Sequence, residues 1–403
     1  MHRWGMGMLC LAALIAYVQR SALSVPTKNI QADLGIDASA MGWVMATWYW
    51  GYAILQVPAG WIADSIGSRK ALAIYAFAWS ILTGVAGFSG SFGSLIFLWG
   101  LMGMAQAGIF PASAKAIGAW FPTQGRAFAS GLLASSMAVG AALAPAITAQ
   151  LLLKISWQTI LLIYAIPGMT WALLFLWLIP ESSISQTKSI SKGSLKSDWQ
   201  AMLGSVSMLL LCLQQFLRAA AMVFFGTWFT RFLEETKGIT TLDAGRLTAW
   251  AGIGVMLGGI SGGTVSDWVL KKTNNKRLSR QGLAVISMTL CSLLFVLSHF
   301  ISNVHLSVFI MALGAYCGAF GGISGYSVAI DFGGSRIATV FSVMNMCGNI
   351  GAGLFPLIIG KWIQMGNNWS FALFLFAGIF AIDAVIWALL NPKKPLFVDT
   401  EEE

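Results

Sequence analysis

Two arginines lie inside long apolar stretches of the sequence, Arg20 in the first stretch and Arg218 in a later one. If such a stretch spans a membrane, a charged side chain near its centre costs about 2.5–3.5 kcal/mol, so it normally faces a cavity and has a function. A guanidinium group offers a planar fork of N–H donors that suits carboxylate and phosphate oxygens. The two arginines are therefore the first candidates for an anion-binding site.

Polar side chains at helical spacing accompany these arginines. Tyr17 lies three residues before Arg20, and Gln214 lies one turn before Arg218. No acid lies in the central part of the first, fourth or seventh apolar stretch, which disfavours a structural ion pair as the reason for the arginines. Tryptophans such as Trp48 are interpreted as packing or interfacial residues. The predicted substrate-binding residues are Tyr17, Gln19, Arg20, Tyr52, Gln56, Gln106, Gln214, Arg218, Asn345 and Asn349.

The composition indicates that helices in a membrane position these residues. The chain has 403 residues, of which 57% are hydrophobic and only 10% are charged, whereas soluble domains carry roughly 25% charged residues. The apolar runs are too long for the alternating strands of a membrane barrel, which favours an all-α membrane protein with twelve transmembrane helices. The runs cover 5–26, 41–63, 71–90, 95–118, 127–152, 158–179, 202–229, 245–266, 281–301, 306–329, 337–361 and 370–390.

The two halves of the chain repeat one another. Trp157 and Trp369 are 212 residues apart, as are Pro180 and Pro392, and Arg20 precedes Arg218 by 198. A drifting offset of this kind is expected of a duplicated six-helix unit, and such duplication is typical of transporters with a site between the halves. We predict two six-helix bundles with pseudo-twofold symmetry, at 1–181 and 199–403, joined by a Ser- and Lys-rich cytoplasmic linker at 182–198.

Loop charges predict the orientation in the membrane. Most lysines and arginines gather on one face, which also receives both termini and the linker, and the positive-inside rule assigns that face to the cytoplasm. This distribution accounts for the net charge of +9 and favours a cell membrane over nucleic acid as the partner. The residues on that face are Arg3, Arg69, Lys70, Arg126, Lys188, Lys192, Lys196, Lys271, Lys272, Lys276, Arg277, Arg280, Arg336, Lys393 and Lys394.

A glycine-rich charged loop follows the second apolar run. Its Gly-x-x-x-Asp-x-x-Gly-x-Arg-Lys pattern resembles the signature loop of the major facilitator superfamily, with every position filled. Its glycines permit close helix approach, and its charged groups can hold cytoplasmic helix ends together. A degraded copy in the second half keeps Asp267, and Lys115 is expected to pair with Asp331 as a gate. The predicted gating residues are Gly60, Asp64, Gly67, Arg69, Lys70, Lys115, Asp267 and Asp331.

Within that superfamily, the first span is similar to that of the anion:cation symporter family, which includes bacterial sugar-acid transporters and vesicular glutamate transporters. The similarity lies in Tyr17–Val25, in Gln106–Pro111 of span four and in stretches of spans two and eleven. It implies alternating-access transport of a small organic anion, held by Arg20 and Arg218. The chain departs from the family where a proton-coupling acid pair is usual, because Gln19 and Gln106 occupy those positions and glutamine cannot titrate.

Proton coupling through the family's usual pair is therefore not expected, and facilitated flow, exchange or another coupling ion stays open. Asp383, the other acid well inside a span, is interpreted as snorkelling or locally paired. Exchange of organophosphate for phosphate is the alternative function, because paired arginines suit phosphate equally, and a non-transporting sensor is a second. No catalytic, cofactor or metal-binding pattern stands out, so an enzyme is not expected. We expect a monomer in the lipid bilayer.

Overall fold

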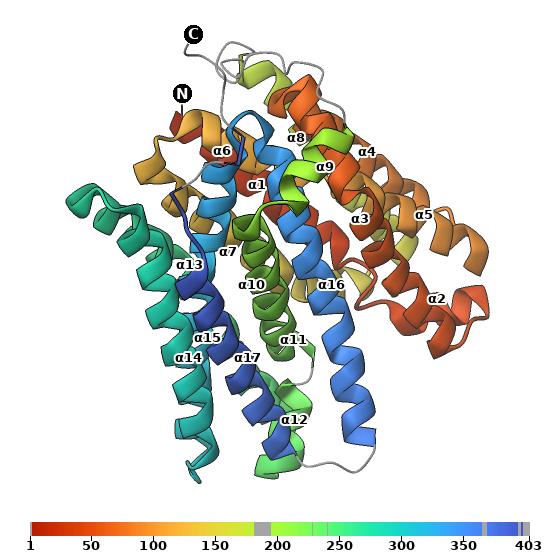
Figure 1. Cartoon of the computed structure of the whole chain (residues 1–403). Helices are drawn as coiled ribbons and strands as arrows, with labels where there is room; N and C mark the ends of the chain where they lie inside the picture. The colour runs from red at the N-terminus through yellow and green to blue at the C-terminus, as the bar shows by residue number, and fades with distance from the viewer. Residues whose placement is uncertain are drawn as a thin grey trace. The chain divides into compact units, whose positions relative to one another are not determined.

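The computed structural model of the chain describes residues 2–180, 195–227, 229–239, 241–364, 369–393 and 396–397, and these form helices and turns without a strand (Figure 1). Three short stretches are 3-10 or π turns: η1 (Thr123–Gly125), η3 (Arg277–Gly282) and η4 (Gly334–Arg336). The α-helices are α1 (His2–Arg20), α2 (Thr27–Leu34), α3 (Ala38–Ile66), α4 (Ser68–Ala86), α5 (Phe92–Gln106), α6 (Ile109–Trp120), α7 (Arg126–Leu152), α8 (Trp157–Leu178), α9 (Leu195–Leu203), α10 (Val206–Met222), α11 (Phe224–Thr227), α12 (Phe229–Lys237), α13 (Thr241–Thr273), α14 (Leu283–His299), α15 (Val304–Gly333), α16 (Ile337–Gln364) and α17 (Trp369–Leu389).

The helices follow the apolar runs of the sequence. Each predicted span falls on one helix or on a short succession of helices. Among the described residues, eight helices are long and apolar enough to cross a membrane, and the shorter apolar helices Trp4–Arg20 and Val206–Met222 occupy the first and seventh predicted spans. The prediction of an all-α protein with several membrane-crossing helices is therefore confirmed.

The fourth predicted span is divided between α5 and α6 by a close helix contact. A Cβ atom at Gly108 would collide with the ring of Tyr75 on α4, and the Tyr75 hydroxyl donates a hydrogen bond to the carbonyl oxygen of Ala59 at 2.7 Å. Pro111, in the first turn of α6, lacks the N–H that would continue the α5 ladder. The helix is therefore interrupted at the point where it passes an aromatic ring.

The chain divides into two compact units. Unit 1 comprises Met1–Phe121, Ser136–Gly193 and Ser335–Ser342, and unit 2 comprises Pro122–Ser135, Ser194–Gly334 and Val343–Glu403. The division near residue 193 falls inside the predicted linker, but residues 181–194 lie outside the described part of the chain. Helix α9 begins at Leu195, three residues before the predicted linker end. Two helices are divided between the units. The start of α7, up to Ser135, belongs to unit 2 and the remainder to unit 1, whereas the start of α16, up to Ser342, belongs to unit 1 and the remainder to unit 2. The sequence repeat did not predict this division.

In unit 2, α13 packs directly against the backbone of α15. Glycines recur at every fourth position of α13, at Gly254, Gly258 and Gly262. A Cβ atom at any of them would collide with α15, at the carbonyl oxygens of Ala312, Tyr316 and Phe320 in turn. Small residues at this spacing allow membrane helices to approach closely, which increases van der Waals contact. The stripe therefore fixes the separation of two long helices of unit 2.

Candidate functional site

Arg20 ends α1 within a group of aromatic rings. The guanidinium carbon lies 3.9 Å from the ring centroid of Trp48, 4.8 Å from that of Tyr49 and 5.2 Å from that of Tyr17. The Arg20 side chain also forms a hydrogen bond with the Tyr49 side chain. Aromatic faces attract a cation without neutralising it, so the rings hold the guanidinium group while leaving its positive charge available to an anion.

A small cavity of about 120 Å³ opens beside this guanidinium group. Residues from the end of α1 and from α3 and α5 line it, including Ser24, Met45 and Trp99. Pockets for whole ligands usually measure about 300–1,000 Å³, so this cavity has room for one acidic group rather than for a complete sugar acid. Within unit 1, Arg20 thus marks an electropositive end of a site.

Trp48 connects Arg20 to another predicted residue, Tyr52. The Trp48 and Tyr52 rings are stacked with centroids 4.8 Å apart, and Trp48 Nε1 donates to Met102 Sδ at 3.1 Å. The sequence interpretation of Trp48 as a packing residue omits its contact with Arg20. Trp48 and Tyr52 are four residues apart and so share one helix face, and this spacing is the sequence signal that could have linked Trp48 to the predicted residues.

Three glutamines in the described part of unit 1 are buried, and two of them bond between helices. Gln19 on α1 donates from Nε2 to the Tyr164 carbonyl oxygen of α8 at 2.5 Å, and its Oε1 accepts from Trp79 Nε1 of α4. Gln106 Nε2 donates to the Ala16 carbonyl oxygen at 2.9 Å, and Gln56 is fully buried. These contacts use the Gln19 and Gln106 amides for helix packing, and their predicted contact with substrate stays a prediction.

Arg218 of unit 2 is held by different means. Its Nη2 donates to Gln215 Oε1 at 2.7 Å, its guanidinium carbon lies 5.7 Å from the Tyr326 ring centroid, and its side chain packs against Gly322 on α15. Its Nε has no hydrogen-bond partner within the described residues. A guanidinium group that is fixed on one side by a hydrogen bond, and whose Nε–H has no partner, is suited to bind an acceptor oxygen.

The amides around Arg218 divide into two kinds. Gln214 is fully buried and donates to the Leu211 carbonyl oxygen of its own helix at 2.8 Å, whereas its neighbour Gln215 is the partner of Arg218. The predicted set contains Gln214 and lacks Gln215, although Gln215 has the i, i+3 spacing from Arg218 that brings side chains together on a helix. On α16, Asn349 Nδ2 donates to the Asn345 carbonyl oxygen at 2.9 Å, and both asparagines are half-buried.

The structure excludes one of the two interpretations of Asp383. This residue of α17 is 0% exposed, so it does not snorkel, and neither carboxylate oxygen has a hydrogen-bond partner among the described residues. The positive charge of Arg218 acts on it electrostatically. The Asp383 carboxyl group therefore lies in the packed interior of unit 2. The rotation of α17 about its own axis, rather than the length of the side chain, determines which groups surround it.

The signature loop of unit 1 holds three helices together. Asp64 accepts from the backbone nitrogens of Ala338 and Thr339, at 3.2 and 2.7 Å, and so caps the start of α16. Lys115 Nζ of α6 lies 3.3 Å from Asp64 Oδ1 and donates to the Asp64 carbonyl oxygen at 2.9 Å. At Gly60 a Cβ atom would collide with Ser342, which explains the glycine at this position of the pattern.

The rest of this loop shapes the α3–α4 turn. Gly67 has φ +86°, a left-handed conformation that favours glycine. Arg69 donates to the carbonyl oxygens of Leu176 and Ile179 at the end of α8, where a cation is favourable. Lys70 is exposed at the start of α4.

The degraded copy in unit 2 makes an equivalent contact. Asp267 Oδ2 accepts from the backbone nitrogen of Phe128 at 2.7 Å in the first turn of α7, and Asp267 Oδ1 lies 2.9 Å from Arg280 Nη2. Each conserved-position aspartate of the repeat thus caps the start of a long helix and pairs with a buried cation.

The expected pairing of Lys115 with Asp331 stays a prediction, because the two residues belong to different units, and each has a partner inside its own unit. Lys115 pairs with Asp64, as above, and Asp331 pairs with Arg126 at 2.5 Å and with Lys276 at 3.2 Å. Arg126 and Lys276 flank the ends of α7 and α13 in unit 2, where Asp331 at the end of α15 can reach them.

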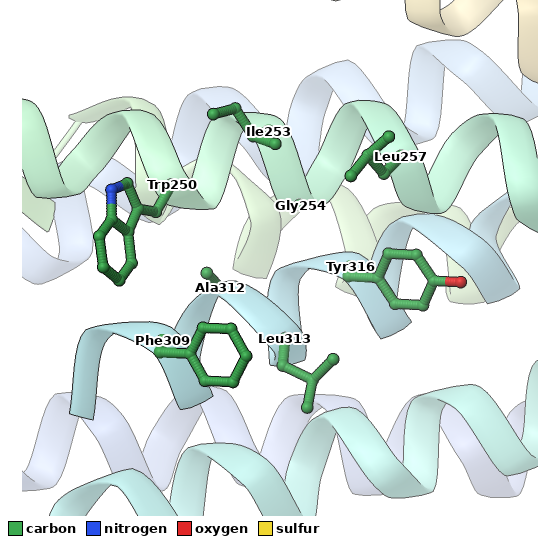
Figure 2. Close-up of a pocket in the computed structure, with 8 residues that line it drawn as sticks. All are labelled: Trp250, Ile253, Gly254, Leu257, Phe309, Ala312, Leu313 and Tyr316. Atoms are coloured by element: carbon green, nitrogen blue, oxygen red, sulfur yellow. The ribbon is translucent and has the colours of Figure 1, made fainter. Parts of the chain in front are cut away.

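An apolar groove of unit 2 is not suited to an anion. It lies between α13 and α15 and is lined by Trp250, Ile253, Leu257, Phe309 and Leu313, together with Gly254, Ala312 and Tyr316 (Figure 2). The Tyr316 hydroxyl accepts from Ser261 Oγ at 2.8 Å. No charged side chain lines this groove, so it offers nothing to a carboxylate. Within the described residues there is also no cluster of three or more His, Cys, Asp or Glu that could hold a metal ion.

Comparison with known proteins identifies the relatives of this chain. The family model described as Major Facilitator Superfamily matches residues 9–356. The chain is 28% identical to the "Probable galactarate/D-glucarate transporter GudP" of Bacillus subtilis, over 98% of this chain and 93% of the relative. It is also 28% identical to the "D-galactonate transporter" of Escherichia coli, over 95% of this chain and 94% of the relative.

A solved structure has the same fold. The crystal structure of a variant of the Escherichia coli fucose:proton symporter FucP matches with a TM-score of 0.77 at 16% identity, covering 97% of this chain and 99% of that one. This likeness confirms the predicted fold class, and it extends over both halves of the chain.

Proposed function

The chain belongs to the Major Facilitator Superfamily, and on that premise we propose that it is an alternating-access secondary transporter of a small organic anion, a carboxylate or sugar acid. The protein is a membrane transporter and not an enzyme. The relatives named above transport sugar acids according to their descriptions. Because those acids carry carboxylates, the arginines are the groups of this chain best suited to bind them.

One observation supports this assignment most directly. Arg20 borders a cavity and is surrounded by Trp48, Tyr49 and Tyr17, with ring contacts at 3.9–5.2 Å. Aromatic rings keep the guanidinium charge unneutralised, in contrast to Lys115 or Arg280, which pair with acids. A half-buried cation inside an apolar span without an anionic partner is costly to maintain, and binding of a substrate carboxylate would offset that cost.

We propose that Arg218 provides the second contact. Gln215 fixes one side of its guanidinium group, and the unpartnered Nε can donate to a substrate oxygen. Arg20 and Arg218 occupy matching positions of the two repeats, and transporters with this duplication bind substrate where the halves meet.

The two aspartate caps are proposed as the conformational elements. Asp64 holds the first turn of α16 and Asp267 holds the first turn of α7, and the remainder of each helix belongs to the other unit. Release of a cap would free the start of a helix that continues into the moving half. We further propose that both termini are cytoplasmic, following the loop charges.

The test measures ligand-dependent thermal stability of the purified protein. A ligand that binds the native state at 100 times its Kd stabilises it by about 2.7 kcal/mol. The panel contains aldonates, aldarates, simple mono- and dicarboxylates, amino acids, inorganic phosphate and phosphate esters. The variants are Arg20→Ala and Arg218→Ala, and the matched control is Arg246→Ala, because Arg246 is exposed and pairs only loosely with Asp243.

Sugar acids should raise the melting temperature of the wild type and of Arg246→Ala. In Arg20→Ala and Arg218→Ala the affinity should fall about 10- to 150-fold, because a hydrogen bond to a charged group contributes about 1.5–3 kcal/mol. A response restricted to phosphate and phosphate esters would instead establish an organophosphate exchanger. An undiminished response in both alanine variants would exclude the arginine clamp.

A further inference from the structure

Asp383 is a buried acid for which the transport of an anion alone gives no reason. It lies in α17, is 0% exposed, and both of its carboxylate oxygens lack a hydrogen-bond partner among the described residues. An ionised carboxylate in such a place loses its hydration without compensation, which costs several kcal/mol. The group therefore carries a proton, or depends on a nearby positive charge when it is ionised.

The groups around Asp383 come from the helices packed against α17. From α10, Arg218 acts on the carboxylate as the charged neighbour. From α14, the thiol of Cys291 is close enough to interact with Asp383, and Cys317 of α15 interacts with that thiol in turn. One turn along α17, Trp387 is fully buried with an unpartnered Nε1. At the α17 end near η3, Arg280 is already paired with Asp267.

Arg218 is thus shared by two anions, one fixed and one transported. When no substrate is bound, its charge stabilises ionised Asp383. When a substrate carboxylate contacts Arg218, that charge is compensated, and the ionised form of Asp383 loses its support. Protonation of Asp383 in turn leaves Arg218 free for the substrate. The two binding events favour each other, and the coupling must be reciprocal.

From this arrangement, and resting on the proposed function, we propose that Asp383 is the proton-binding residue that couples anion transport to proton movement. One proton adds to the carboxylate as the anion binds to Arg218, and the same proton leaves to the opposite side when the anion is released. Coupling would then reside in unit 2, whereas Gln19 and Gln106 in unit 1 cannot titrate and are used in helix contacts.

The first test separates exchange from proton-driven accumulation in proteoliposomes. The probe is the sugar acid that gives the largest thermal shift. Asp383→Asn keeps the size of the side chain and removes its titration, and Asp383→Glu restores it. An inward proton gradient should drive accumulation by the wild type and by Asp383→Glu. Asp383→Asn should exchange labelled for unlabelled anion but should accumulate none above equilibrium.

The second test detects the proton directly. In infrared difference spectra, the carbonyl stretch of a protonated carboxyl group should increase when substrate is added to the wild type at constant pH, and the increase should be absent from Asp383→Asn. Ser292→Ala is the matched control, because Ser292 is also buried on α14 against α17 and bonds to the Ala377 carbonyl oxygen. It should keep the infrared signal.

The outcomes are distinguishable. If Asp383→Asn accumulates anion under a proton gradient as the wild type does, or if both exchange anion and neither accumulates it, the coupling role is excluded while the proposed function stands. If no anion binds or exchanges, the proposed function itself fails. An infrared signal that persists in Asp383→Asn assigns the proton to another group and overturns the proposal.

Discussion

At the scale of single residues, the neighbours of an arginine determine what it can bind. Among the described residues, the cations inside the helical units differ in their surroundings. Lys115 and Arg280 have carboxylate partners and support helix packing, whereas Arg20 is surrounded by rings and borders a cavity. A ring that faces the guanidinium group orients it without occupying its N–H donors. The aromatic environment is therefore part of the proposed anion site.

The first prediction concerns Trp48, whose ring lies closest to Arg20. Trp48→Leu should weaken anion binding about 3- to 30-fold, because a cation–π contact contributes about 0.5–2 kcal/mol. Trp48→Phe keeps a ring and should restore part of the affinity. Titration of the anion by isothermal calorimetry in detergent measures the effect. Equal affinities in the wild type and both variants would mean that Arg20 is oriented without this ring.

The candidate residues could be predicted from the sequence in part, for a physical reason. A charge inside an apolar run is rare and costly, so Arg20, Arg218 and Asp383 stand out whatever the fold. An amide at such a position has no comparable cost. Gln19 and Gln215 both lie one turn or less from an arginine, yet Gln19 bonds to α4 and α8 while Gln215 bonds to Arg218. That difference depends on helix rotation, which tertiary packing determines.

At the scale of helices, the repeated pattern indicated that Asp64 and Asp267 hold helix ends, but it did not indicate which cations pair with them. The glycine-rich pattern correctly indicated a close approach at Gly60 and a left-handed turn at Gly67. Within unit 1 Lys115 pairs with Asp64, and its expected partner Asp331 belongs to the other unit. The apolar runs and the repeat offsets also could not predict that α7 and α16 are each divided between the two units.

The second prediction concerns the buried pair Asp64–Lys115. Asp64→Asn should destabilise the protein by about 3–5 kcal/mol, because Lys115 is left as an uncompensated buried charge. Lys115→Met in the same protein should recover much of that loss, since the charge is removed. Thermal unfolding of the wild type, both single variants and the double variant completes the cycle. Additive losses would show that the two groups do not interact.

The third prediction tests the glycine stripe of α13. Gly258→Ala should lower the melting temperature, because its Cβ atom would collide with the Tyr316 carbonyl oxygen and separate α13 from α15. Gly252→Ala on the same helix is the control, since no atom lies within 4 Å of a Cβ atom there. It should leave the melting temperature unchanged or raise it slightly, because alanine favours a helix. A similar loss in both variants would contradict the packing argument.

At the scale of the whole molecule, the two halves share a plan and differ in chemistry. Each has an arginine at the matching position of its first helix and an aspartate that caps a long helix. The buried acid whose carboxylate oxygens lack a hydrogen-bond partner among the described residues is Asp383 of unit 2. At the offset of 212 residues that relates Trp157 to Trp369, the matching residue of unit 1 is Trp171. The proposed substrate binding thus uses the duplication, while the proposed coupling depends on a departure from it.

The last prediction concerns the orientation of the whole chain. The last turn of α13 carries Lys271 and Lys272, whereas the segment between α4 and α5 carries no basic residue from Gly87 to Ser91. The positive-inside rule therefore places the end of α13 in the cytoplasm and the α4–α5 segment outside. Lys271→Cys and Gly90→Cys introduce exposed thiols at these two positions, in a protein whose five native cysteines are replaced. A membrane-impermeant maleimide should label Gly90→Cys in intact cells and Lys271→Cys only in inside-out vesicles. The reverse labelling pattern would contradict the proposed orientation of the chain. It would also reverse the direction in which the proton proposed for Asp383 crosses the membrane.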